Sequence, residues 1–294
     1  MDNEGSKLSL ISLKELLMDA KKKKYGVFAT NAFTFEMAET IIRAGEEKRS
    51  PVILMIAEDL FQFLNPEITG CSIIRMIKKS TVPVVFHLDH GMNFENVVRS
   101  LDWGYNSIMF DGSKYSLAKN IEIMKELRKL TGKLGISLEG EVGYVGGLEA
   151  GEQEVEKQQI DASRFTKVED AVEFTYKTEV DALAIAVGTI HGRFRFKPDL
   201  DFKRITEVYN AVEVPLVLHG SSGLSDKDFK KAIACGITKI NYFTDLVTAA
   251  TEKTSEIVNK KEGFSYLSLN KTVMESVKEK IKEKMDIFGS SGKA

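Results

Sequence analysis

Short runs of β-branched and aliphatic residues recur along the whole chain, and segments with helical periodicity separate them. The eight predicted strands are Gly26–Thr30, Val52–Ala57, Val84–Asp89, Ser107–Asp111, Ser137–Val142, Ala182–Val187, Leu216–His219 and Lys239–Tyr242. Several are apolar almost throughout, as strands buried on both faces of a parallel sheet are. Apolar residues spaced three and four apart predict helices over Phe35–Lys48 and Ser116–Thr131. This alternation of strand and helix requires parallel pairing through helical crossovers.

Helix signals also lie outside the repeated units. Ser12 is followed three residues later by Glu15, and Ser225 by Asp228, the spacing that begins helices. A final amphipathic helix is indicated by a four-residue step through Val273, Val277, Ile281 and Met285. We therefore predict an α/β fold, a (β/α)8 TIM barrel with additional N- and C-terminal helices, as one domain over residues 1–294. A doubly wound open sheet is the structural alternative.

Composition excludes several classes of function. The formal net charge is -2, which provides no general attraction for nucleic acid or an anionic membrane. No apolar run is long enough to cross a bilayer, and the first residues lack a signal pattern. The two cysteines, Cys71 and Cys235, have no metal or disulfide spacing. These features predict a cytoplasmic protein that acts on a small molecule, with no nucleic-acid or membrane partner.

Histidines gather where predicted strands end. The third strand reads VVFHLDHG and finishes in Asp89 and His90, while His191 and His219 follow the sixth and seventh strands. In a barrel these ends share one face, where active sites lie. Three imidazoles with an open fourth position make a catalytic zinc site. His87 shares a strand face with Asp89, and we interpret it as a residue of the barrel interior or one that supports a ligand, with no ligand role of its own.

Glycine-rich turns after the sixth, seventh and eighth strands predict an anion site beside the histidines. Backbone N–H groups in such turns bind phosphate in many barrels. The candidate substrate- and phosphate-binding residues are Asn31, Gly192, Gly220, Ser222, Asn241 and Thr244. The polar stretch Gly143–Thr166 is long for a barrel loop, and such loops are either lids or disordered.

These stretches resemble the class II, metal-dependent ketose-bisphosphate aldolases, which include fructose- and tagatose-bisphosphate aldolases. The resemblance covers essentially the whole chain. It rests on VVFHLDHG at 84–91, SIMFDGS at 107–113, LEGEVGYVGGLE at 138–149, AIAVGTIHG at 184–192, LVLHGSSGLS at 216–225, KIN at 239–241 and the terminal FGSSGKA. It implies a zinc-dependent lyase of carbohydrate metabolism that reversibly joins dihydroxyacetone phosphate to an aldehyde.

The resemblance also assigns roles to residues. His90, His191 and His219 would hold one Zn²⁺ per subunit, with Glu141 as an alternative ligand. Asp89 would exchange a proton with the C4 hydroxyl of the ketose, and Glu149 would move the proton that creates the enediolate. A monovalent cation near the phosphate and a homo-oligomer, a dimer or tetramer, are further family features.

Three departures from the family concern the substrate. Ala57 stands where relatives carry a serine, and Phe243 where fructose-specific members carry an aspartate. The stretch Glu262-Gly263-Phe264 matches a family Asp-Pro-Arg whose arginine binds the distal phosphate. Losing that arginine removes a bidentate phosphate partner. We therefore expect a ketose other than fructose 1,6-bisphosphate; Arg193 and Arg195 are candidates for binding another anion.

Other functions stay open at this level. Metal-assisted hydrolysis would use the same ligands, and a catalytically silent paralogue would bind a sugar phosphate without turnover. A lysine Schiff-base mechanism is disfavoured, because the sixth strand has no lysine and Lys239 is placed at the start of the eighth strand, away from the site.

Overall fold

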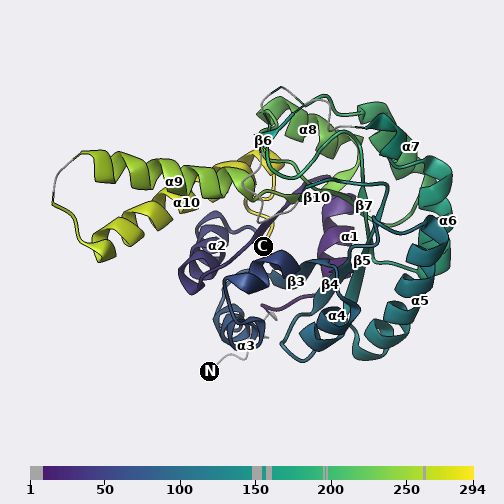
Figure 1. Ribbon diagram of the computed structural model, residues 1–294, viewed down its shortest axis with the longest axis horizontal. Helices are drawn as coiled ribbons and strands as arrows, with labels where there is room; N and C mark the ends of the chain where they lie inside the picture. The colour runs from purple at the N-terminus through teal and green to yellow at the C-terminus, as the bar shows by residue number, and fades with distance from the viewer. Residues whose placement is uncertain (1–8, 148–153, 157–160, 195, 197, 261–262) are drawn as a thin grey trace.

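The predicted TIM barrel is confirmed by the computed structural model, which describes residues 9–147, 154–156, 161–194, 196, 198–260 and 263–294. The strands of the closed barrel are β1 (Val27–Asn31), β2 (Val52–Ala57), β3 (Val84–Gly91), β4 (Ser107–Phe110), β5 (Ser137–Val142), β7 (Ala182–Ile185), β9 (Leu216–Leu218) and β10 (Ile237–Asn241). They are all parallel and follow the order β1-β10-β9-β7-β5-β4-β3-β2 (Figure 1). Strands β6 (Glu154–Val155) and β8 (Arg193–Phe194) form a separate two-stranded sheet.

Helices surround the barrel and close one of its ends. They are α1 (Leu13–Lys23), α2 (Phe35–Lys48), α3 (Pro66–Ile77), α4 (Phe94–Ser100), α5 (Leu117–Leu134), α6 (Val168–Thr178), α7 (Phe202–Ala211), α8 (Asp226–Cys235), α9 (Thr244–Asn259) and α10 (Tyr266–Phe288), with short 3-10 helices η1 (Glu58–Gln62) and η3 (Ala162–Arg164). The capping signals behave as expected. The side chains of Ser12 and Ser225 accept hydrogen bonds from the backbone N–H groups of Glu15 and Asp228.

Two apolar layers hold the barrel together. The larger lies between the strands and the outer helices. The smaller fills the barrel interior, where α1 buries Leu13, Leu16 and Leu17 against side chains such as Ile53 and Val85. Helix α1 therefore closes the amino-terminal end of the barrel, which leaves the carboxyl ends of the strands as the open face.

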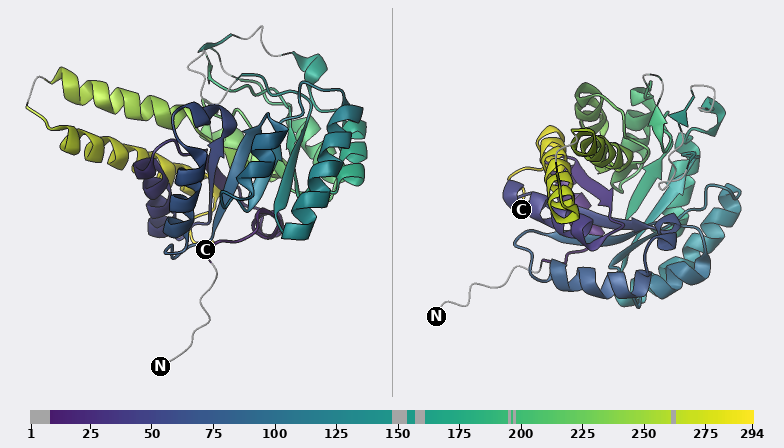
Figure 2. Two further views of the ribbon diagram at one scale, coloured as in Figure 1. Left: turned by 60° about the horizontal axis from the view of Figure 1, so that its bottom comes forward. Right: turned by 60° about the vertical axis from the view of Figure 1, so that its left-hand side comes forward.

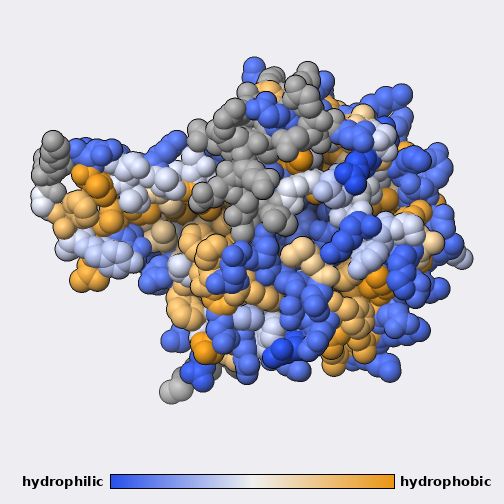
Figure 3. Space-filling model, viewed as in Figure 1, coloured by the Kyte–Doolittle hydropathy of each residue, from blue (hydrophilic) through white to orange (hydrophobic). Residues whose placement is uncertain are grey.

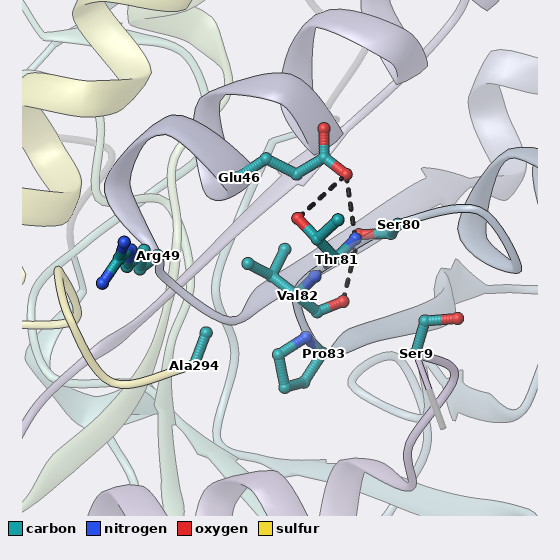
Figure 4. A pocket seen from close by; sticks show the side chains of 8 residues that line it. All are labelled: Ser9, Glu46, Arg49, Ser80, Thr81, Val82, Pro83 and Ala294. Carbon is teal, nitrogen blue, oxygen red and sulfur yellow. Dashed lines mark hydrogen bonds between the residues drawn. The ribbon is translucent and has the colours of Figure 1, made fainter. Parts of the chain in front are cut away.

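A cavity of about 290 Å³ lies at the closed end (Figure 4). It lies between the turn before β3 and the C-terminal residue Ala294. In its wall Glu46 accepts hydrogen bonds from the backbone N–H of Thr81, at 2.9 Å, and from its hydroxyl, at 3.4 Å. Because Val82 and Pro83 precede β3, this cavity is on the opposite side from the strand ends that carry the histidines.

A helical hairpin formed by α9 and α10 projects from the side of the barrel (Figures 1 and 2). The part of α10 near the barrel packs on α2 and buries the four predicted apolar residues. Toward the tip, Tyr266 and Leu267 are 76% and 80% exposed, and hydrophobic side chains cover much of the hairpin face seen in Figure 3. The C-terminal part of α10 is therefore buried against the barrel, whereas its first residues are exposed.

Candidate active site at the carboxyl ends of the strands

The three predicted histidines converge on one point. One ring nitrogen from each of His90, His191 and His219 lies within 4.8 Å of the corresponding nitrogens of the other two. All three side chains are buried. His90 follows Asp89 on β3, while the other two follow β7 and β9, so three separate repeats supply the cluster. The strand-end argument from the sequence predicted this meeting point.

Each histidine is oriented through its second ring nitrogen. His90 Nδ1 donates to Asp111 Oδ2 at 3.2 Å, and His219 Nε2 donates to Glu139 Oε1 at 2.9 Å. His191 Nδ1 lies 3.0 Å from the carbonyl oxygen of Gly146, to which it donates. These contacts fix the tautomers, so that Nε2 of His90 and His191 and Nδ1 of His219 carry the lone pairs.

This donor set fits a divalent metal ion. His90 Nε2 and His219 Nδ1 face each other at 2.8 Å, although both are acceptors in the tautomers just described. Either a shared proton or a bound cation satisfies both nitrogens, and the carboxylates of Asp89 and Asp111, which raise the pKa of His90 against its burial, favour positive charge at this point. Imidazoles held through their second nitrogen by carboxylates and a carbonyl are the usual environment of zinc ligands.

His90 has a backbone conformation that is unusual for a residue with a side chain. Its φ of 44° is left-handed, which costs a non-glycine residue about 1–2 kcal/mol. The turn that follows is tied down by Glu58, whose carboxylate accepts hydrogen bonds from the backbone N–H groups of Met92 and Asn93, the latter at 2.9 Å. The surrounding structure thus holds His90 in the conformation that points its ring at the other two histidines.

Asp89 lies beside the histidines with both carboxylate oxygens engaged. Asn31 Nδ2 donates to Oδ2 at 2.9 Å, and Asn241 Nδ2 donates to Oδ1 at 3.2 Å. Burial raises the pKa of Asp89, but the neighbouring His90 and His219, with the hydrogen bond from Asn31, outweigh it and lower the pKa to about 2. Asp89 is therefore ionised at neutral pH. Among the described residues, the amide oxygens of Asn31 and Asn241 are buried without a hydrogen-bond partner.

Glu141 lies near the histidines, but among the described residues it is not part of the group whose ligand atoms meet. Its side chain is 1% exposed, and Oε1 accepts from the backbone N–H of Val145 at 3.4 Å. Burial, helped by the charge of Asp111, raises the pKa of Glu141 to about 8. A carboxyl group in this environment is largely protonated at neutral pH, so metal ligation by Glu141 would require it to lose a proton.

The predicted phosphate residues form the rim beside β9 and β10. Gly220 has a φ of 58°, and a Cβ there would lie 2.6 Å from the backbone carbon of Ile190, so only glycine fits. Ser222 Oγ accepts from the N–H of Asp245 at 3.3 Å, which brings it to the start of α9. Thr244 begins this 16-residue helix, and helix N-termini favour anions. Gly192 has a φ of 115° and follows His191.

Some expectations lie outside what the structure describes, and one location differs from expectation. Glu149 and Arg195 are outside the described residues. Asn241, predicted to bind substrate or phosphate, donates its amide N–H to Asp89, and its predicted role stays a prediction. Lys239 was expected to lie away from the site. It is instead in the middle of β10 with its ammonium inside the barrel, 2.7 Å from Glu139 Oε2.

Sequence reasoning assigned no role to Asp111 or Glu139, which orient two histidines. Both were visible as carboxylates at the end of β4 and within β5, strands that read as buried. Because a buried carboxylate needs a charged or hydrogen-bonding partner, these two positions in the sequence could have indicated contacts with the histidines.

The closed parallel barrel and its histidine cluster define a (β/α)8 enzyme fold with three ligands that could hold a metal ion. The chain belongs to the class II fructose-bisphosphate aldolase family, because the family model "Fructose-bisphosphate aldolase class-II" matches residues 11–293. It is accordingly an aldolase, a lyase.

Two relatives and one solved structure illustrate the range of the family. The chain is 34% identical over 294 residues to 6-phospho-5-dehydro-2-deoxy-D-gluconate aldolase of Bacillus subtilis, covering 98% of each chain. It is 36% identical over 288 residues to sulfofructosephosphate aldolase of Alkalicoccus urumqiensis, covering 98% of this chain and 99% of that one. The crystal structure of the YdjI aldolase from Escherichia coli K12 superposes with a TM-score of 0.86 at 36% identity, covering 97% and 99% of the chains.

Proposed function

We propose that the protein is a zinc-dependent aldolase that cleaves a phosphorylated or otherwise anionic ketose, other than fructose 1,6-bisphosphate, into dihydroxyacetone phosphate or dihydroxyacetone and an aldehyde. The convergence of His90, His191 and His219 is the observation that carries the proposal. These three residues would hold one Zn²⁺ per subunit. A divalent ion there supplies Lewis-acid stabilisation of the negative charge that cleavage leaves on the former carbonyl oxygen.

The chain's own residues handle the protons. Asp89 accepts the proton of the C4 hydroxyl during cleavage and returns it during synthesis, because it is ionised and held by two amides. The buried amide oxygens of Asn31 and Asn241 accept hydrogen bonds from substrate hydroxyl groups. Glu149 exchanges the proton on the carbon that becomes the enediolate. The turn at Gly220 and Ser222, with Gly192 and the start of α9 at Thr244, binds the phosphate of the three-carbon unit.

The distal end of the ketose is where substrate choice is made. Phe243 is 4% exposed and packs edge-on against Phe33, with ring centroids 6.1 Å apart. Ala57 contributes no hydroxyl at the end of β2. Neither aromatic ring offers a hydrogen-bond partner for a second phosphate. Two relatives of similar identity carry names with different substrates, so overall likeness does not select the ketose.

Cleavage of a ketose panel tests the proposal. Fructose 1,6-bisphosphate is compared with ketose monophosphates and sulfonated or carboxylated ketoses, with metal content measured on the same samples. We expect metal-dependent formation of a three-carbon ketone and a clear preference against the bisphosphate. A strong bisphosphate preference refutes the substrate assignment. Water-derived products without carbon–carbon cleavage would indicate a hydrolase, and binding without turnover would indicate a silent paralogue.

Sodium borohydride trapping separates the two aldolase mechanisms. Lys239 is fully buried and paired with Glu139, so its side chain is held away from an incoming carbonyl. We expect no reduced covalent adduct in the presence of substrate. Mass spectrometry that found such an adduct on any lysine would replace the metal mechanism by a Schiff base.

The proposal extends to assembly and location. A homo-oligomer, a dimer or tetramer, would cover the exposed apolar side chains of the hairpin, among them Tyr266 and Leu267. Light scattering of wild type and Leu267→Glu tests this, and an unchanged monomeric mass in both would contradict it.

The free thiol of exposed Cys71 suits a reducing cytoplasm. None of the described helices is long and apolar enough to cross a membrane. Activity compared in sodium, potassium and choline buffers tests for a monovalent cation.

A further inference from the structure

A layer of charged and polar side chains lies in the barrel interior directly beneath the histidine cluster. Lys239 on β10 places Nζ 2.7 Å from Oε2 of Glu139 on β5. The other oxygen of Glu139, Oε1, accepts the hydrogen bond from His219 Nε2 at 2.9 Å. The side chains of all three residues are 0% exposed. His87 Nε2 lies 3.7 Å from Glu139 Oε2, and its Nδ1 lies 2.8 Å from the hydroxyl of Ser107.

Stability alone does not account for this ion pair. Removing two charges from water costs several kcal/mol each, and apolar replacements of buried ion pairs are often as stable or more so. Elsewhere the barrel interior follows that rule. Its amino-terminal layers contain aliphatic side chains, among them Val27, Ile53 and Val217, packed on α1. The pair occurs in a layer of the barrel that contacts a candidate metal ligand, His219.

The two oxygens of Glu139 have different partners, which fixes the carboxylate. Because Lys239 holds Oε2, rotation of the carboxyl group would break a charged hydrogen bond inside a dry interior. Oε1 is therefore held facing His219 Nε2. That contact keeps the imidazole proton on Nε2 and directs the lone pair of Nδ1 toward His90 Nε2, 2.8 Å away.

We propose that Lys239 is a positioning residue of the metal centre, which acts through Glu139 to fix the tautomer and orientation of His219. The proposal rests on the metal-binding function proposed above and adds a residue that does not touch the metal. It predicts that loss of Lys239 loosens one of the three ligands while leaving the other two, held by Asp111 and Gly146, in place.

Cobalt binding provides the test, because the visible absorption of Co²⁺ reports ligand geometry without any substrate. We compare wild type, Lys239→Met, Glu139→Gln and the double variant. The matched control is Lys278→Met, which removes another ion pair of a largely buried lysine, Lys278 with Glu47 at 2.7 Å, between α10 and α2. Affinities come from chelator competition with Co²⁺ and Zn²⁺, and folding is checked by circular dichroism and urea denaturation.

We expect Lys239→Met to weaken metal affinity about 10- to 100-fold, the range seen when partners of metal ligands are removed, and to change the cobalt spectrum. Lys278→Met should keep the wild-type affinity and spectrum. Because Lys239 acts through Glu139, the losses in the double variant should be less than additive. If Lys239→Met does not fold, Glu139→Gln gives the comparison, because it keeps the shape but removes the charge that Lys239 holds and turns an NH2 group toward one of the two donors.

Wild-type affinity and an unchanged spectrum in the folded Lys239 variant would overturn the positioning role, as would additive losses in the double variant. When only Glu139→Gln folds, wild-type affinity together with an unchanged spectrum in that variant would also overturn the positioning role. Failure of the wild-type protein to bind Co²⁺ or Zn²⁺ would instead overturn the proposed metal function itself. The two failures are therefore distinguishable in one set of titrations.

Discussion

Replacing Asp89 by asparagine should remove turnover while leaving the metal ligands in place. The carboxylate oxygens accept from Asn31 Nδ2 at 2.9 Å and from Asn241 Nδ2 at 3.2 Å. An amide offers one acceptor where the carboxylate offers two, so a buried N–H would face another N–H. That mismatch should lower the free energy of unfolding by about 1–3 kcal/mol. The catalytic effect is larger, since loss of a proton acceptor costs about 10²–10⁴-fold in rate.

The assay measures kcat, KM and zinc content for wild type and Asp89→Asn on the best ketose of the panel. A rate loss in that range corresponds to a barrier higher by about 3–5 kcal/mol. Zinc content should remain near wild type, because His90, His191 and His219 are all retained. A variant with full zinc content and turnover within a few-fold of wild type would refute the assignment of Asp89 as the proton acceptor.

Three further predictions concern the phosphate turn, the metal and Glu141. Gly220→Ala should raise KM for phosphorylated substrates and lower the free energy of unfolding by about 1–2 kcal/mol, because its φ of 58° is left-handed; equal KM in both proteins would contradict this. Chelation should abolish activity and lower the melting temperature, since ligand at 100 times Kd stabilises by about 2.7 kcal/mol; zinc should restore both, and a chelator-insensitive enzyme would exclude the metal. In metal-free protein, the raised pKa of Glu141, about 8, means that the folded state holds its proton when the unfolded state has lost it. The free energy of unfolding should therefore fall between pH 5 and pH 8, and less steeply in Glu141→Gln; parallel urea-denaturation profiles would refute this.

The fold could be predicted because its signals are local and repeated. The predicted bounds of β2, a continuous apolar run, and of β5 match those observed, and Phe35–Lys48 has the predicted limits. The meeting of His90, His191 and His219 followed from topology, since parallel strands bring their carboxyl ends together. The wrong prediction concerned the position of one side chain along the barrel axis. Lys239 lies in a strand whose start and end were placed two residues and one residue too late, so its side chain was misplaced relative to the site.

The projecting hairpin and the turn at His90 could not be predicted for a different reason. Among the described residues near the tip of α9 and α10, the apolar side chains of Phe264, Tyr266 and Leu267 are exposed, and the periodicity indicated a helix without indicating what its exposed face contacts. The left-handed backbone of His90 depends on Glu58, which is 32 residues away in sequence and contacts the following turn. Such tertiary restraints have no local pattern in the sequence.

Along the barrel axis, the interior side chains change from aliphatic residues near α1 to polar residues near the candidate active site. Near α1 the interior layers are aliphatic, with Ile53, Val85 and Val217 among them. Toward the carboxyl ends the interior becomes polar and fully buried, beginning with Glu139 and Lys239. Because apolar burial stabilises at about 25 cal/mol per Å² while buried charges cost energy unless paired, the polar layers depend on the aliphatic ones for stability. Conservative substitutions near α1 should therefore change the free energy of unfolding without changing metal affinity, whereas those around Glu139 should change both.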